Sequence, residues 1–328
     1  MSNPNAALGR VKLSAFVPPD SADSFLRFLS QLGVSYGYTW MQDLPEHYDD
    51  LMRLKDRMAA HGISLYNAGD YTIGKSAAIH LGSEKRDEMI GRFAKMLETL
   101  RRAGIYTTTF TWEADRVWST PKEAFARGGA PARFVDEREL EGVDLTHGRV
   151  YEKEELWGNF AYFMRKIIPV AEATGVRLAL HPNDPPMPMI AGIASLITSF
   201  ADYRKAFDIA GSKMLGMEFC CGCWLEGGER FGDMLAAIDA FVREGRVFVT
   251  HFRNVTDTLP VFTETFLDEG YMDMQKVMDV FYAADDDGTI IYDHTPQMEP
   301  EMGTGAATAF AIGYMKALMN TASRKVFA

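Results

Sequence analysis

The feature that most constrains the fold of this chain is a repeated succession of a helical stretch, a glycine and an apolar run. Glycine is favoured just past the end of a helix because it adopts the left-handed conformation without a steric cost. Eight apolar runs are predicted as strands: residues 11–17, 34–40, 63–69, 105–112, 176–183, 215–222, 247–254 and 289–295. Continuous apolar runs that alternate with helices indicate buried parallel strands. We therefore expect an α/β fold, a single (β/α)8 TIM barrel that spans residues 1–328.

The stretches between the predicted strands have helical periodicity. Apolar side chains recur every three or four residues in Arg86–Ala103 and in Leu156–Thr174. One segment departs from the alternation, because residues 113–155 after the fourth strand form a long loop rich in glycine, proline and charge. Long loops in compact domains are usually functional, and barrel active sites form where strands end. We expect this loop to contribute to the site.

Composition narrows the class of protein. The formal net charge of −11 argues against a nucleic-acid partner, because phosphate binding needs clustered Lys and Arg. No apolar run approaches the roughly 18 residues that span a membrane, and residues 1–10 lack a signal-peptide core. The three cysteines, all within residues 220–223, do not form a disulfide framework. We expect a cytoplasmic protein without nucleic-acid or membrane partners, and the sequence leaves a homo-oligomer open.

Four consecutive predicted strands end in side chains that are good metal ligands: His181, Cys220, His251 and Asp293. Each one alone has an ordinary structural explanation as a hydrogen-bonded histidine, a small buried thiol or a helix cap. Together they predict a divalent metal site, because ligands in this fold come from different strand ends. Two imidazoles, a thiolate and a carboxylate suit Mn, Fe, Co or Zn better than Mg or Ca. Cys223 is a weaker rival ligand, and Cys221 is expected on the opposite face of its strand.

The motifs around these residues resemble those of the mannonate dehydratase family. His-Pro-Asn-Asp-Pro-Pro at 181–186 resembles that family's His-Pro-Asp-Asp-Pro-Pro, and Cys220-Cys-Gly is similar to its Cys-Thr-Gly. His251-Phe-Arg-Asn-Val resembles His-Leu-Arg-Asn-Val, and Asp293-His294 resembles the start of Asp-His-Gly. The resemblance covers most of the chain, and the 181–186 run is its most specific element.

The resemblance implies a xylose-isomerase-like barrel that binds Mn²⁺ and dehydrates D-mannonate, or a related aldonate, to a 2-keto-3-deoxy acid. It implies that the four strand-end residues bind the metal and that His294 is the catalytic acid or base. Arg253 is predicted as a second catalytic residue at the same rim, where it could pair with a substrate carboxylate; the alternative is a supporting ion pair. Three further residues are predicted to bind substrate: Arg133, Trp112 and Asn183.

Two departures from the family's pattern keep other activities open. The family has a Tyr shortly after Asp-His, whereas residues 302–307 of this chain contain none, and Asn183 stands where the family has an Asp. The alternatives are a metal-dependent sugar isomerase or epimerase, which would use Glu218, Glu264 or Glu299, and a catalytically silent sugar-binding relative. The main expectation remains a lyase that removes water by proton abstraction next to a carboxylate.

Overall fold

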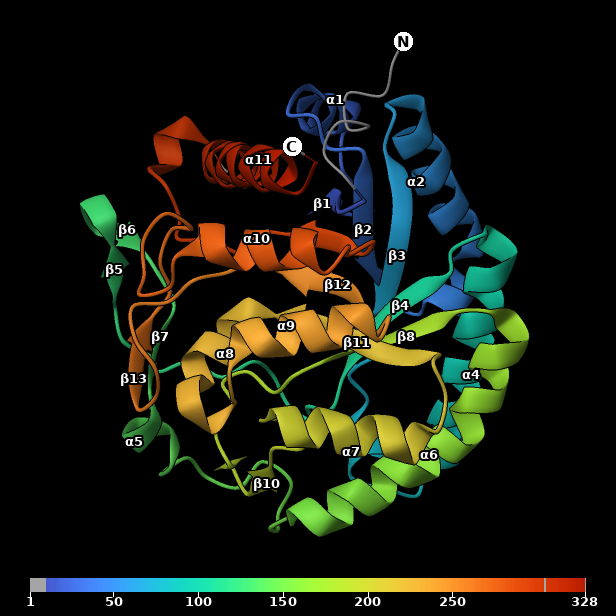
Figure 1. Cartoon of the computed structure of the whole chain (residues 1–328). Coiled ribbons are helices and arrows are strands. Elements are labelled where there is room, and N and C mark those ends of the chain that lie inside the picture. Colours follow the sequence, from blue (N-terminus) through green and yellow to red (C-terminus); the bar gives the residue numbers. More distant parts are fainter. Residues whose placement is uncertain (1–9, 304, 328) are drawn as a thin grey trace.

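The computed structural model describes residues 10–303 and 305–327, and its centre is an eight-stranded parallel sheet curled into a nearly closed barrel (Figure 1). Neighbouring strands follow the order β3-β2-β1-β14-β12-β11-β8-β4. The strands are β1 (Lys12–Phe16), β2 (Tyr36–Met41), β3 (Ser64–Asp70), β4 (Thr107–Thr111), β8 (Arg177–His181), β11 (Leu215–Cys220), β12 (Val247–His251) and β14 (Thr289–Ile291). The predicted barrel is confirmed, and each strand lies within one of the predicted apolar runs or extends it by one residue.

The barrel closes between β3 and β4, the two ends of the strand order. Across this seam the Thr108 hydroxyl donates to the Ala68 carbonyl over 2.8 Å, and the Thr111 backbone N–H donates to the Gly74 carbonyl over 3.2 Å. These bonds tie the first half of the barrel to the second half. The ends of β3 and β4 are thereby brought to the same rim.

A ring of helices covers the outside of the barrel (Figure 1). The main helices are α1 (Asp23–Gln31), α2 (Tyr48–Ala60), α4 (Arg86–Ala103), α6 (Lys153–Thr174), α7 (Phe200–Ala210), α9 (Met234–Arg243), α10 (Met274–Ala283) and α11 (Gly305–Phe327). The predicted bounds of α4 are confirmed, and α6 begins three residues before the prediction. The core lies between barrel and helices, as where Phe93 of α4 packs edge-on against Phe110 of β4 and Phe163 of α6.

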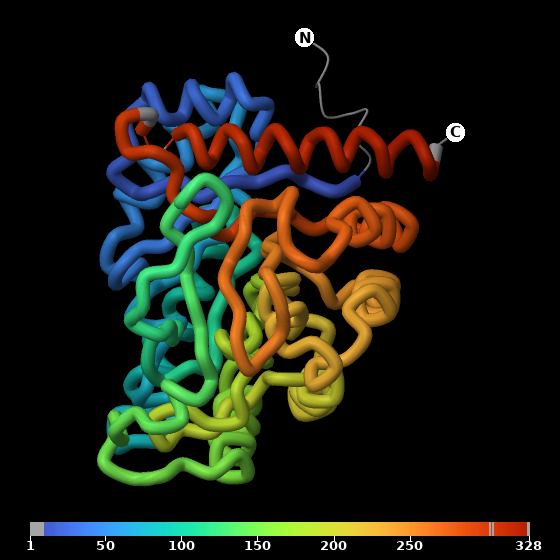
Figure 2. The backbone as a smooth tube through the Cα atoms, turned by 90° about the vertical axis from the view of Figure 1, so that its left-hand side faces the viewer, coloured from blue at the N-terminus to red at the C-terminus, as the bar shows by residue number. Residues whose placement is uncertain are grey.

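The long segment after β4 folds over the rim where the strands end. It contains β5 (Phe125–Ala126), β6 (Ala130–Pro131), β7 (Phe134–Asp136) and α5 (Glu137–Leu140). β7 pairs antiparallel with β13 (Val261–Thr263), which follows β12, so two loops far apart in the sequence form one small sheet. Figure 2 looks onto this side, where the green and orange loops run next to each other. The expectation that this loop contributes to the rim is consistent with its position.

Shorter elements complete the connections. They are α3 (Ala77–His80), α8 (Cys221–Gly227), β9 (Met189–Ile190), β10 (Ile193–Ala194) and single turns at Leu44–Glu46, Arg127–Gly129, Gly228–Arg230 and Pro300–Met302. Within the described ranges, no helix combines the length and the apolar character that membrane crossing requires. The expectation about a signal peptide concerns residues that, apart from Arg10, lie outside the described part of the chain.

Several predicted strands run too far at their carboxyl ends, and one placement is wrong as a result. The sixth run was predicted to continue to Gly222, which would put Cys221 on the face opposite Cys220. Instead β11 ends at Cys220 and α8 begins at Cys221. The cause is local, because the Cys220 sulfur caps the helix by accepting the Cys223 backbone N–H over 3.4 Å. Cys221 is therefore a buried helical residue rather than part of a strand.

Candidate active site

Three of the predicted ligands end three strands of the same sheet. His181, Cys220 and His251 are the last residues of β8, β11 and β12, which lie side by side. One donor atom from each side chain lies within 4.8 Å of the others, and the two imidazole rings are 5.1 Å apart. Parallel strands that end in register thus bring together side chains that lie far apart in the sequence.

His181 is oriented by a backbone hydrogen bond. Its Nδ1 lies 2.7 Å from the Pro182 carbonyl oxygen, so Nδ1 carries the proton and donates it. The lone pair is then on Nε2, the arrangement typical of a histidine that binds a metal. Burial opposes a charge on the ring, but the hydrogen bond and charge of Cys220 outweigh it and raise the pKa of His181.

Cys220 is fully buried, and its surroundings favour the thiolate. Burial alone would raise its pKa, but the hydrogen bond with the Cys223 thiol and the nearby Arg253 guanidinium lower it well below the ordinary value. The Arg253 Nη2 atom lies 3.5 Å from the Cys220 sulfur. The thiolate is the form of cysteine that binds metal ions.

Asp293 approaches this group from β14, two residues beyond the end of that strand. Its backbone is left-handed, with φ of 61°, a conformation uncommon for residues other than glycine and frequent at functional sites. Asp293 Oδ1 lies 3.3 Å from His251 Nδ1, and Glu218 Oε1 lies 2.9 Å from His251 Nε2. Burial opposes the charge on each group, yet the two carboxylates raise the pKa of His251, and His251 and His294 lower that of Asp293.

These residues fit a divalent cation. A thiolate and two carboxylates, from Cys220, Asp293 and Glu218, lie around two imidazoles in a largely buried position and raise the pKa of both rings, so a cation could replace the protons that these anions favour there. The mixture of imidazole, thiolate and carboxylate matches the ligand preferences of transition metals. Asp293 lies beside the set of three mutually close donors and reaches it through His251.

His294 follows Asp293 and leans toward the same rim. Its Nδ1 lies 2.8 Å from Glu264 Oε2, and its Nε2 lies 3.4 Å from Asp293 Oδ2. Burial opposes protonation, but these two carboxylates outweigh it and raise the pKa of His294. Its side chain keeps 46% of its surface exposed, so the imidazole can exchange protons with solvent.

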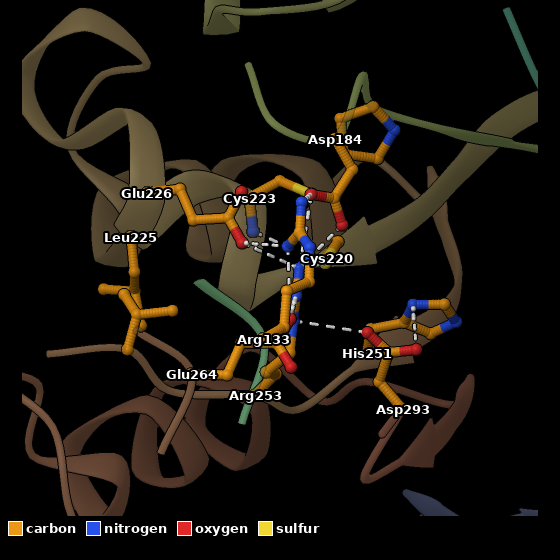
Figure 3. A network of polar contacts seen from close by, with 12 residues as sticks. Arg133, Asp184, Cys220, Cys223, Leu225, Glu226, His251, Arg253, Glu264 and Asp293 are labelled. Carbon is orange, nitrogen blue, oxygen red and sulfur yellow. Dashed lines mark hydrogen bonds and ion pairs between the residues drawn. The ribbon is translucent and has the colours of Figure 1, made fainter. Parts of the chain in front are cut away.

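Behind the ligands lies a buried ion-pair network, which Figure 3 shows as two guanidinium groups enclosed by carboxylates. Arg133, from the long loop, pairs with Asp184 over 2.6 Å and with Glu226 and Glu264 over 3.3 and 3.1 Å. Arg253 pairs with the same three carboxylates and, over 3.3 Å, with Asp293. Arg253 is only 1% exposed and its observed contacts are with protein groups, which favours the supporting ion pair; its catalytic role stays a prediction.

The arginine network also explains a second cluster of metal-binding residue types. Asp184, Cys223 and Glu226 bring their donor atoms within 4.8 Å of one another. Both arginines already contact Asp184 and Glu226, which supplies the positive charge that this cluster needs. We therefore read it as part of the ion-pair network. Gly222 makes the packing possible, because a Cβ there would collide with the Arg253 guanidinium.

The candidate ligands His181, His251 and Asp293 line a cavity of about 310 Å³ at the rim, whereas Cys220 is fully buried and does not line it. This volume is at the small end of the roughly 300–1,000 Å³ of ligand pockets, and it suits a small sugar acid. The lining residues are Phe16, Tyr38, Trp40, Tyr71, Lys75, Phe110, Thr111, Glu113, Val117, His181, Asp184, Glu218, His251, Asp293 and His294. Three of the candidate ligands, His294 and a group of aromatic side chains therefore share one space.

The three predicted substrate residues lie outside this lining. Trp112 is buried and packs against His80 and Phe160. Asn183 is buried too, and its side-chain oxygen accepts the Ile197 backbone N–H over 2.8 Å. Arg133 is held in the ion-pair network. Their substrate contacts remain predictions, and the observed partners of all three are protein groups.

Two lining residues, Glu113 and Lys75, were missed by the sequence reasoning. Glu113 lies two residues beyond the end of β4, in the same position relative to its strand as Asp293 relative to β14. The rule that polar residues at strand ends face the rim, applied to the fourth strand as well, would have identified it. Lys75 lies in the loop after β3, where no periodic signal distinguishes it.

The carboxylates that the alternative isomerase would use lie in different places. Glu218 lines the cavity, Glu264 lies in the ion-pair network and Glu299 is exposed.

Comparison with known proteins identifies the family. The sequence model of the D-mannonate dehydratase (UxuA) family matches residues 144–327. Mannonate dehydratase 2 of Halalkalibacterium halodurans is 25% identical over 301 residues, which cover 82% of this chain and 83% of that protein. The mannonate dehydratase of Bacillus subtilis is 26% identical over 252 residues, covering 66% of this chain and 68% of that protein.

Solved structures agree on the fold. The mannonate dehydratase from Streptococcus suis serotype 2 superimposes with a TM-score of 0.87 at 22% identity, covering 97% of this chain and 95% of that chain. The IOLI protein, solved with a bound zinc atom, superimposes with a TM-score of 0.62 at 13% identity over 94% of this chain and 98% of that one. With the family match over more than half of its length, the chain belongs to the D-mannonate dehydratase family, a family of hydro-lyases that act on sugar acids.

Proposed function

We propose that this protein dehydrates D-mannonate or a closely related aldonate, with Mn²⁺ as its metal and with His181, Cys220, His251 and Asp293 as the metal ligands. The observation that supports the proposal best is the meeting of His181, Cys220 and His251 within 4.8 Å, beside a cavity that is lined by both of these histidines and by His294. The relatives named above act on mannonate by their names, which makes this acid the first substrate to test. Three free cysteines support a reducing, cytoplasmic setting.

A bound divalent cation supplies Lewis-acid stabilisation of the charge that develops when the proton beside a carboxylate leaves. The residues of the chain provide the rest of the chemistry. His294 is placed to remove that proton, because its imidazole lines the cavity and exchanges with solvent. Glu264 holds the His294 ring through the 2.8 Å contact to Nδ1 and leaves Nε2 for the reacting proton.

The aromatic wall limits the water that reaches the substrate. Phe16 is the last residue of β1, Tyr38 and Trp40 lie in β2, and Tyr71 follows β3. Trp40 and Tyr71 pack with ring centroids 5.2 Å apart. Aromatic faces of this kind suit the C–H faces of a sugar chain and lower the local dielectric, which strengthens the electrostatic contacts inside.

The test is incubation of the purified, Mn²⁺-loaded protein with a panel of hexonates in D2O. We expect a 2-keto-3-deoxy acid, with the loss of one water, from D-mannonate or one of its stereoisomers, and no product after removal of the metal with a chelator. Deuterium exchange without loss of water would favour an isomerase or epimerase. Saturable binding without either reaction would identify a silent sugar-binding relative, and both results would contradict the proposal.

A further inference from the structure

Loss of water next to a carboxylate requires two proton transfers. A base removes the proton from the carbon beside the carboxylate, and an acid protonates the hydroxyl that leaves the following carbon, since hydroxide itself is a poor leaving group. His294 can perform one transfer. The residue that performs the other has no assignment, because the Tyr that the family pattern has after Asp-His is missing from this chain.

Most titratable side chains of the cavity are already committed. His181, His251 and Asp293 belong to the ligand set, and Glu218 is held 2.9 Å from His251. Asp184 pairs with both arginines of the network, and the charges of those arginines, against the effect of burial, lower its pKa to about 2. It therefore stays a carboxylate.

The remaining candidates differ in how readily they release a proton. Burial raises the pKa of Tyr38 far above its ordinary value, so its proton is held too tightly. Tyr71 is 53% exposed at the edge of the cavity, and burial raises its pKa as well. Lys75 lies with its ammonium 5.6 Å from the centre of the Trp40 ring, a position suited to a substrate anion. Glu113 is the group that remains.

The position of Glu113 is fixed by the fold. It follows β4 by two residues, is 9% exposed and lines the cavity. One carboxyl oxygen, Oε1, accepts the backbone N–H of Asp184 from the loop after β8, so the side chain is anchored between two strand ends. The charged groups that face it are Asp184 and His181 from β8 and its loop, and Lys75 from the loop after β3.

The environment of Glu113 makes its carboxyl group more often protonated near neutral pH than an ordinary glutamate. Burial contributes most, and the negative charge of Asp184 adds to it, so that the pKa of Glu113 is raised to about 7. A carboxylic acid that is partly protonated at working pH is a suitable general acid, because the proton is both present and transferable.

We propose that Glu113 donates the proton to the departing hydroxyl, while His294 removes the proton beside the carboxylate. This assignment rests on the proposed dehydratase function and goes beyond it by naming the second proton-transfer group. In the first step His294 takes the proton, and the C–H electron pair stays on the substrate as the enolate of the carboxylate. In the second step that pair becomes the new C=C bond, the C–O bond of the neighbouring carbon breaks, and the Glu113 O–H proton leaves with that oxygen as water. The enol then becomes the ketone by moving its hydroxyl proton to carbon. His294 loses its proton to solvent and Glu113 regains one, so the enzyme is restored.

The first experiment compares Glu113→Gln with the wild type in D2O. We expect dehydration to fall by about 10²- to 10⁴-fold, the usual contribution of a general acid. We also expect deuterium to enter recovered substrate beside the carboxylate, because His294 still removes the proton and the intermediate returns. Metal content should be unchanged. Glu123→Gln, an exposed glutamate on the same long segment, is the matched control and should behave as wild type. Unchanged dehydration by Glu113→Gln, or loss of exchange together with dehydration, would overturn the assignment.

The second experiment varies the leaving group and does not depend on the stability of one variant. An aldonate with fluorine in place of the departing hydroxyl needs less help from an acid, so Glu113→Gln should lose less than about 10-fold on it. Glu113→Asp, the conservative variant, should show the same preference for fluoride loss in weaker form. Equal losses on both substrates would overturn the acid role and indicate a purely structural residue. If the wild type eliminates neither water nor fluoride, the proposed function fails; if it eliminates both and the variants do so equally well, only this inference fails.

Discussion

The two halves of the barrel rim differ in chemistry. On one side, β8, β11, β12 and β14 end in or near the imidazoles, the thiolate and the carboxylate that form the candidate metal site. On the other side, β1 to β4 and their loops contribute Phe16, Tyr38, Trp40 and Phe110, together with Lys75 and Glu113. On our proposals, the first half binds the metal and supplies His294, and the second half supplies shape, substrate contact and one proton.

The family match follows the same division. The sequence model matches residues 144–327, which contain the strands of the predicted ligands and His294, whereas β1 to β4 lie before its start. Because the predicted ligand set lies inside the matched part and the aromatic wall outside it, we expect variants in the first part to affect the metal and variants in the second to affect the substrate.

The largest effect is expected from the ligand half. Cys220→Ser replaces the thiolate ligand, so we expect loss of bound metal and a fall in turnover of roughly 10⁴-fold or more, since metal stabilisation contributes several kcal/mol. Metal analysis and turnover measurement check this. Cys221→Ala, at the neighbouring buried thiol outside the donor set, should retain its metal. Full metal content in Cys220→Ser would contradict the role of Cys220 as a metal ligand.

His294→Asn removes a proton-transfer group and leaves the ligand set intact. Turnover should fall by about 10²- to 10⁴-fold with the metal retained, and deuterium exchange beside the carboxylate should stop, because the base is missing. The exposed residue His47 is suited as a control, and His47→Asn should keep wild-type rates. Continued exchange in His294→Asn would show that another group removes the proton.

Arg253→Met separates the support of the ligand half from its chemistry. Without this guanidinium, Asp184, Glu226 and Glu264 lose a buried partner, and breaking such a pair costs about 3–5 kcal/mol of unfolding free energy. Denaturant unfolding measures the change. Arg138→Met, which breaks a pair at a side chain 71% exposed, should change the unfolding free energy little. Equal effects of the two variants would contradict the buried network.

The pH dependence of the unfolding free energy tests the half of the barrel that contains the aromatic wall. Burial lowers the pKa of His80, which packs on Trp112 behind the wall, to about 3. In the unfolded chain this histidine has the ordinary pKa of 6.5 and takes up a proton below that pH, whereas in the folded chain it stays neutral down to a pH of about 3. Its contribution to stability is therefore fully present above pH 6.5 and is lost as the pH falls below that value. Between pH 7 and 5 the loss from this residue is about 2 kcal/mol. Between pH 7 and 5, the unfolding free energy of His80→Gln should fall less than that of the wild type. An identical fall in both proteins would contradict the lowered pKa of His80.

The smallest effect is expected from Lys75. It is the only Lys or Arg among the described residues that line the cavity, so its ammonium is the natural contact for a substrate carboxylate. Lys75→Met should raise KM by about 10-fold and lower kcat by a smaller factor, because the ammonium already attracts the carboxylate of the bound substrate and the contact strengthens only in part as charge develops. Steady-state kinetics decide this. A lower kcat at constant KM would assign Lys75 to the chemistry instead.

Much of the fold could be predicted because its signals are local. Glycines after helices, apolar runs and helical periodicity indicated the eight strands and the two helices with predicted bounds. The strand ends brought His181, Cys220 and His251 together as expected, because parallel strands in one barrel end at the same rim. Their role as ligands, and the extent of a single domain over residues 1–328, stay predictions.

The remaining features depend on contacts that no local pattern contains. The pairing of β7 with β13 joins two loops, and Arg133 then reaches carboxylates from three other segments. Its neighbours could not be inferred from its position in the sequence, and the same is true of Lys75. The strand ends were overextended because the helix that begins at Cys221 depends on capping by the Cys220 sulfur, a contact that apolar composition does not reveal.

The central claim is that the metal binds on the β8–β14 side of the rim. Anomalous diffraction from a crystal of the Mn²⁺-loaded protein, recorded on both sides of the manganese absorption edge, tests it most directly. We expect one strong anomalous peak for manganese, within about 2.5 Å of donor atoms from His181, Cys220, His251 and Asp293. A peak at Asp184, Cys223 and Glu226, or a fully active protein with no peak at either cluster, would contradict it.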